Sequence, residues 1–185
     1  AGMLEPLENI PDSTGIMLID ADTLFEHGKL AVEHGLSLAI HAIGDKANRV
    51  VLDGLERLRL YEKQHGITSL KHRIEHAQLL HPDDIARLAN LAIVGSMQPI
   101  HTTSDLDISD KYWGSRSVGA FVFKTLLDLG TLLIFGSDAP VESPNPFYGL
   151  HAAVTRRRAN GDPSVEGWHP EQKISLYQAL QGFTT

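Results

Sequence analysis

Residues 132–140 read LLIFGSDAP, an apolar run from Leu132 to Phe135 that passes directly into the polar turn Gly136–Pro140. A short apolar run bounded by turn residues is typical of a strand that is covered on both faces of a sheet. Three earlier stretches also predict strands, and each leads to a polar residue. They are residues 36–40 before His41, the alternating residues 70–76 that end at His76, and residues 91–97 before Gln98.

Helical patterns fill the intervals between these predicted strands. Pro82 predicts the start of a short helix, because proline suits the first helical turn. Ser175 with Gln178 resembles a capping box, and Asp22 is expected to cap a helix ahead of the first strand. Strands that alternate with helices predict an α/β fold with a parallel sheet. Apolar residues at spacings of three and four predict helices over residues 24–32, 47–58, 118–129 and 147–157.

The predicted strand ends are evenly spaced. His41 and Asp138 lie 97 positions apart over three units, or about 32 residues per unit. A (β/α)8 barrel of ~250 residues averages about 31 per unit, so the spacing favours a barrel. A doubly wound sheet of similar unit size stays open. Only four strands are readable, so we predict that residues 1–185 form one partial domain, half of a barrel, with residues 1–15 as a loop remnant.

The composition excludes several classes of protein. The chain has 185 residues, a net charge of -7 and a single basic cluster at Arg156–Arg158, which argues against a nucleic-acid surface. No apolar run approaches the ~20 residues of a membrane-spanning helix. The absence of cysteine excludes disulfides and thiolate metal sites. It leaves the compartment open, and we favour the cytoplasm.

Three polar residues at predicted strand ends indicate a metal site. Barrel enzymes place their chemistry at the carboxyl ends of the strands, where this chain has His41, His76 and Asp138. Imidazoles and a carboxylate suit zinc or a similar divalent ion, which activates water, and Asp138 is the natural proton acceptor. The alternatives are structural histidines and an Asx turn at Asp138. No G-x-S-x-G elbow, P-loop or H-E-x-x-H motif points to another chemistry.

Four strings in this order resemble the amidohydrolase superfamily, in the YtcJ-like branch that includes N-substituted formamide deformylase. The resemblance covers roughly residues 15–185, and its strings are HAIGD at 41–45, HRIEH at 72–76, QPIH at 98–101 and GSDAP at 136–140. It implies a (β/α)8 barrel with a small β-sandwich, and metal-dependent hydrolysis of an amide-type C–N bond. A phosphotriesterase-like or lactonase-like activity on the same barrel is the second enzymatic reading.

The resemblance also implies roles for individual residues. His41 would be the metal ligand ending strand 5, His76 the ligand ending strand 6, and Asp138 the ligand and proton shuttle ending strand 8, with zinc the expected metal. Arg73 and Glu75 point away from His76 by strand parity and are interpreted as a structural ion pair. Four residues of the region after strand 7 are candidates for contacts with a small amide-like substrate: Gln98, His101, Asp105 and Arg116.

The chain lacks two motifs of the family pattern. The H-x-H pair of strand 1 is missing, because no two of the ten histidines stand two positions apart. The lysine of strand 4 is missing too, because Lys46 and Lys71, the lysines nearest a predicted strand end, belong to other strand–helix units. We interpret the chain as the C-terminal half of the barrel, from a protein more than twice as long. We expect the isolated chain to be inactive and to self-associate through exposed sheet edges. The competing reading is a non-catalytic half-barrel module or subunit.

Overall fold

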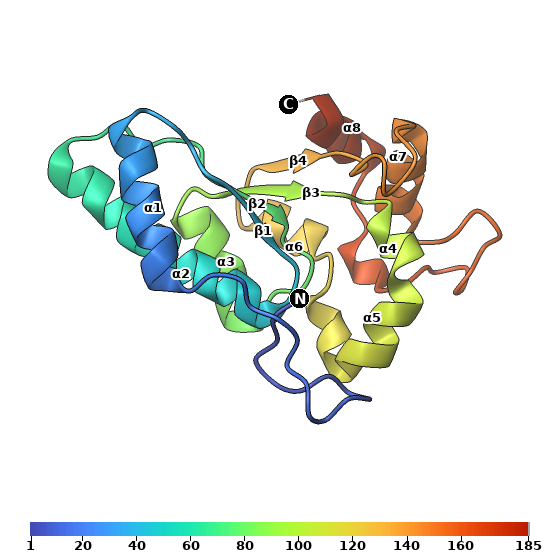
Figure 1. Ribbon diagram of the computed structural model, residues 1–185. Helices are drawn as coiled ribbons and strands as arrows, with labels where there is room; N and C mark the ends of the chain where they lie inside the picture. The colour runs from blue at the N-terminus through green and yellow to red at the C-terminus, as the bar shows by residue number, and fades with distance from the viewer. Residues whose placement is uncertain (185) are drawn as a thin grey trace.

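A computed structural model describes residues 1–184 and contains one parallel sheet of four strands (Figure 1). The strands follow one another across the sheet in sequence order, and the register pairs His41 with Glu75, Glu75 with Ser96, and Ser96 with Ile134. The predicted α/β half barrel, with four parallel strands and flanking helices, is confirmed. The strands are β1 (Ala39–Ala42), β2 (Arg73–His76), β3 (Val94–Met97) and β4 (Leu133–Phe135).

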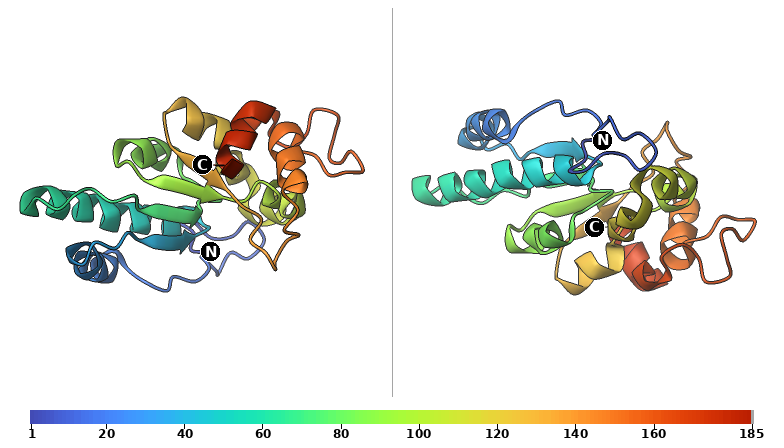
Figure 2. Two further views of the ribbon diagram at one scale, coloured as in Figure 1. Left: turned by 90° about the horizontal axis from the view of Figure 1, so that it is seen from above. Right: turned by 90° about the horizontal axis from the view of Figure 1, so that it is seen from below.

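Helices connect successive strands and surround one side of the sheet, where α2, α3 and α6 follow one another in sequence order (Figure 2). Among residues 1–184, none of these helices combines the length and the apolar character that crossing a membrane requires. The helices are α1 (Ala21–Glu33), α2 (Asp45–His65), α3 (Pro82–Asn90), α4 (His101–Ser104), α5 (Leu106–Trp113), α6 (Phe123–Asp128), α7 (Pro146–Thr155) and α8 (Leu176–Thr184), with 3-10 turns η1 (Gly114–Gly119) and η2 (Pro170–Gln172).

The two faces of the sheet differ in burial. Ile74 of β2 is fully buried against the helices, together with Leu55 and Leu58 of α2. Ala39 and Arg73, which are register partners on the opposite face, are exposed. The concave side that would be the interior of a closed barrel is therefore open, and the outer edges of β1 and β4 have no neighbouring strand within residues 1–184.

Several predicted helix boundaries are confirmed, and two are wrong. Pro82 begins α3, and Ser175 and Gln178 form the reciprocal bonds of a capping box. The cap of α1 is Asp20 rather than Asp22, because the Asp20 carboxylate accepts the Thr23 amide at 2.8 Å. The helix predicted over 118–129 is divided into η1 and α6. Helices α4 and α5 were not predicted, because both are short.

A buried histidine joins three elements near the amino ends of β1 and β2. His72 is fully buried, and its Nδ1 accepts the Leu38 amide at 3.0 Å. Its Nε2 lies 3.0 Å from a carboxylate oxygen of Glu62 on α2. The other Glu62 oxygen accepts from Arg59 at 2.8 Å. This network lies at the amino end of the sheet, whereas the predicted site residues lie at its carboxyl end.

The N-terminal residues 1–15 are irregular but packed. Met3 is fully buried in the core, and the Leu4 amide donates to the Asp45 carboxylate at 2.8 Å. Arg116 donates to the carbonyl oxygens of Glu5 at 2.9 Å and Pro6 at 2.7 Å. These contacts attach the segment to α2 and to the η1 turn.

Candidate metal centre

His41 and His76 meet at the carboxyl ends of β1 and β2. Their ring centroids are 4.6 Å apart, with the rings nearly perpendicular at 73°. His41 is exposed on the open face of the sheet, because the pleat of β1 directs Ala42 toward the helices and His41 to the other side. Neighbouring parallel strands bring their last residues to one edge, so these two imidazoles are brought together by the sheet itself.

The backbone turns left-handed at His76. Its φ is +73°, and that of Ala77 is +43°, conformations that residues with a side chain seldom adopt. Alternation along β2 therefore stops at His76. The prediction that Arg73 and Glu75 form an ion pair is confirmed. The prediction that they face away from the histidine site is wrong, because Glu75 is the register partner of His41 on the open face.

Asp138 and His101 complete a cluster with His76. Asp138 follows β4 at φ +60°, and one of its carboxylate oxygens lies 3.5 Å from His101 Nε2. One ligand atom from each of His76, His101 and Asp138 can be chosen so that all three lie within 4.8 Å of one another. His101, which the sequence suggested as a substrate contact, thus lies among the predicted metal ligands. Glu142 was not predicted, and its carboxylate lies 3.9 Å from His101 Nδ1.

The electrostatics at His76 favour the neutral imidazole that binds metals. Burial is the main cause that lowers the pKa of His76 below its usual 6.5, and the neighbouring His41 adds to the effect. The Asp138 carboxylate and the Gln98 side chain act in the opposite direction. A neutral imidazole keeps a lone pair available for a cation.

Two buried polar atoms in this region have no hydrogen-bond partner. They are Nδ1 of His76 and Oε1 of Gln98, and Gln98 is only 8% exposed. Most buried polar atoms in folded proteins are paired, so such atoms need an explanation. The donor set of two or three imidazoles and one carboxylate fits a divalent cation of the zinc type.

Asp105 and Arg116, predicted as substrate contacts, have other partners. The Asp105 carboxylate accepts from the Gln78 side-chain amide at 2.9 Å. Arg116 donates to carbonyl oxygens of the N-terminal segment and to that of Trp113, so its guanidinium is not directed at the histidine cluster. Gln98, in contrast, follows β3 directly, on the strand next to the one that His76 ends.

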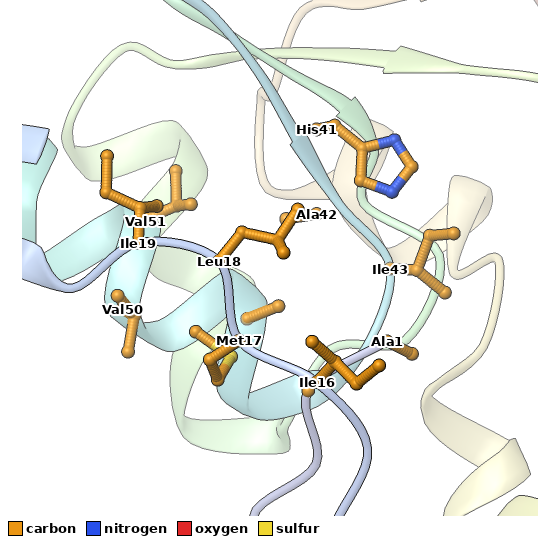
Figure 3. A pocket seen from close by; sticks show the side chains of 12 residues that line it. Ala1, Ile16, Met17, Leu18, Ile19, His41, Ala42, Ile43, Val50 and Val51 are labelled. Carbon is orange, nitrogen blue, oxygen red and sulfur yellow. The ribbon is translucent and has the colours of Figure 1, made fainter.

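An apolar pocket of about 260 Å³ lies beside the outer edge of β1 (Figure 3). Residues 16–19 form one wall, and Ala42, Val50 and Val51 form the other. His41 lies at one end, with its ring turned away from Met17 and Ile16. The pocket adds an apolar surface beside His41.

The chain as a whole matches the Amidohydrolase family over residues 1–185. It is 38% identical to Protein LONG AFTER FAR-RED 3 of Arabidopsis thaliana over 172 residues, covering 92% of this chain and 28% of that protein. It is 32% identical to the putative amidohydrolase YtcJ of Bacillus subtilis over 181 residues, covering 97% and 33%. Identity to the N-substituted formamide deformylase of Arthrobacter pascens is 27% over 152 residues, covering 81% and 27%.

Two solved structures share the fold. Both are crystal structures of uncharacterized metal-dependent hydrolases, one from Pyrococcus furiosus with a TM-score of 0.81 and 32% identity, the other from Pyrococcus horikoshii with 0.85 and 30%. In each case the match covers 99% of this chain and 35% of the other. The chain thus spans about a third of the length of its relatives. It belongs to the amidohydrolase family.

Proposed function

We propose that this chain carries half of the metal centre of a hydrolase that cleaves amide-type C–N bonds. The observation on which this rests is the convergence of His76, His101 and Asp138, whose ligand atoms lie within 4.8 Å of one another, with His41 packed on His76. Support for the bond type comes from similarity to a putative amidohydrolase and to an N-substituted formamide deformylase.

His41, His76 and Asp138 would hold the metal, and zinc is the ion that best suits this donor set. When bound by these residues, such an ion would supply a water that is nucleophilic near neutral pH and a positive charge that polarises a carbonyl group. Asp138 is 37% exposed at its side chain, so it can reach both water and a substrate. Its carboxylate takes a proton from the attacking water and passes it to the leaving nitrogen, which departs as an amine. Gln98 and His101 line this centre as candidate contacts for the substrate.

A complete protein that contains this segment, loaded with zinc, provides the test. We expect hydrolysis of N-substituted formamides or related amides, and a loss of more than about 100-fold in kcat for D138N, because general acid–base catalysis contributes at least this much. Turnover of lactones or phosphotriesters with no turnover of amides would refute the proposed bond type. Activity that survives chelation of all metal would refute the metal centre.

The isolated chain is expected to bind metal weakly and to be inactive, because its concave face is open and only half of a closed site is present. Robust hydrolysis by the purified 185-residue chain with zinc would contradict this expectation.

The unpaired edges of β1 and β4 favour a second candidate, a half-barrel module that self-associates. In a two-fold dimer, β4 of one copy would pair with β1 of the other. Light scattering at increasing protein concentration distinguishes the two. A monomer throughout would exclude the module, and a stable dimer without hydrolase activity in any longer form would favour it.

A further inference from the structure

The two unpartnered buried atoms of the site are chemically complementary. His76 Nδ1 can carry a proton and donate it, whereas Gln98 Oε1 can only accept. Both belong to residues at the carboxyl ends of neighbouring strands, since His76 ends β2 and Gln98 follows the last residue of β3. An unpaired polar atom in a buried position destabilises the fold, so a bond between these two atoms would remove two unfavourable contributions.

The orientation of the Gln98 carboxamide is set by its surroundings. Its Nε2 faces the carbonyl oxygen of Ser96 at 3.4 Å. A flipped carboxamide would place two oxygens against each other, so Oε1 is the atom that is free to turn toward another donor. The register of β2 and β3 pairs Glu75 with Ser96, so His76 lies one residue past this pair on its strand and Gln98 lies two residues past it on the neighbouring strand.

We propose that Gln98 is a positioning residue for His76: its Oε1 accepts Nδ1–H, which leaves the Nε2 lone pair of His76 for the cation. A histidine that binds a metal usually donates its other ring N–H to an oxygen, which fixes the tautomer and the ring orientation. The left-handed backbone at His76 takes this residue out of the regular pleat of β2, so the pleat does not set the direction of its ring. This role rests on the proposed metal centre for its purpose, although the hydrogen bond itself does not require a metal.

The tautomer of His76 in the metal-free chain tests the pairing directly. Long-range 1H–15N correlation spectra at pH 8 with a chelator distinguish Nδ1–H from Nε2–H, and the H76Q variant identifies the His76 signals among those of the ten histidines. We expect the Nδ1–H form in the wild type. We expect Q98L and Q98M to shift His76 toward Nε2–H, and Q98E, which keeps an acceptor, to retain Nδ1–H.

Gln78 provides the matched control. It is also a buried glutamine after β2, but its side chain donates to Asp105, so Q78L should leave the His76 tautomer unchanged. A wild-type chain with His76 in the Nε2–H form would overturn the proposal. So would Q98L and Q98M spectra in which the His76 tautomer is unchanged while the backbone amide spectrum remains that of a folded chain.

Zinc affinity separates this proposal from the proposed function. In a complete protein that contains this segment, competition with a chromophoric chelator should show zinc binding to Q98L weakened by about 10- to 100-fold relative to wild type, as for other residues that orient a metal ligand. If the tautomers of His76 are as expected but the wild-type protein binds no zinc, the proposed metal centre is wrong and the hydrogen bond between Gln98 and His76 stands. Zinc binding of equal strength in wild type and Q98L would overturn the positioning role of Gln98.

Discussion

Replacement of His72 by leucine should destabilise the fold strongly while leaving the candidate metal centre in place. His72 is fully buried, and each of its ring nitrogens has one partner, the Leu38 amide and the Glu62 carboxylate. Leucine has a similar volume, so little cavity forms, but both partners lose a hydrogen bond. A buried polar group without its partner costs about 1–3 kcal/mol, so the loss of two partners in H72L should lower the free energy of unfolding by about 2–6 kcal/mol.

The pH dependence of stability supplies an independent measurement. Burial, and then the nearby Arg59 charge, lower the pKa of His72 from its usual 6.5. The unfolded chain therefore takes up a proton below pH 6.5 that the folded chain excludes until a lower pH is reached. In that window the His72 contribution to stability falls by up to about 1.4 kcal/mol per pH unit. H72L should lack this component, whereas His76 and His169, whose pKa values are also lowered, contribute to both proteins.

Urea denaturation monitored by circular dichroism, with a chelator present, measures both effects. The control is H27L, because His27 is an exposed histidine on α1. The reasoning is refuted if H72L loses no more than about 0.5 kcal/mol relative to H27L, the range of ordinary surface substitutions. It is also refuted if the two variants lose stability equally between pH 6.5 and pH 5.

Three further substitutions address the site and the packing around it. D138N removes a charged ligand and should weaken zinc binding by more than about tenfold in chelator competition, and equal affinity would exclude Asp138 from the centre. G182A should destabilise by about 1–3 kcal/mol, since overpacking costs this much. A Cβ there would lie 2.4 Å from the Phe135 ring, and an unchanged Tm would show that the ring moves freely. R116A removes the bonds that hold the carbonyl oxygens of Glu5 and Pro6. Limited proteolysis should then cut residues 1–15 faster than in wild type, and equal cutting rates would argue against this attachment.

The strand ends were the most predictable part of this protein. Apolar runs and even spacing identified β1 to β4. His41, the third residue of β1, and Asp138, which follows β4, lie at one edge of the sheet because parallel strands end together. Family resemblance added an assignment of roles that periodicity alone left open. The start of α8 was also predictable, because Ser175 and Gln178 form a capping box in which each side chain accepts the backbone N–H of the other residue.

Side-chain direction was less predictable than position. The prediction that Arg73 and Glu75 point away from His76 assumed that side chains alternate along β2 as far as His76. The left-handed backbone at His76 ends this alternation. Asp22 and Asp20 are both acidic residues near the start of α1, and only coordinates show that Asp20 accepts the Thr23 amide. Arg116 carried no local signal that its partners lie some 110 positions earlier in the chain.

The order of the strands has a consequence for how this segment acquires its structure. Each strand pairs only with the strand before or after it in the chain, so no pairing must wait for a remote stretch of polypeptide. Each pairing nevertheless closes a connection of at least one helix, and parallel sheets of this kind form slowly because loop-closure entropy is lost before the strands pair. The four strands can therefore join the sheet in the order in which they are synthesised, each after the helix that precedes it in the chain.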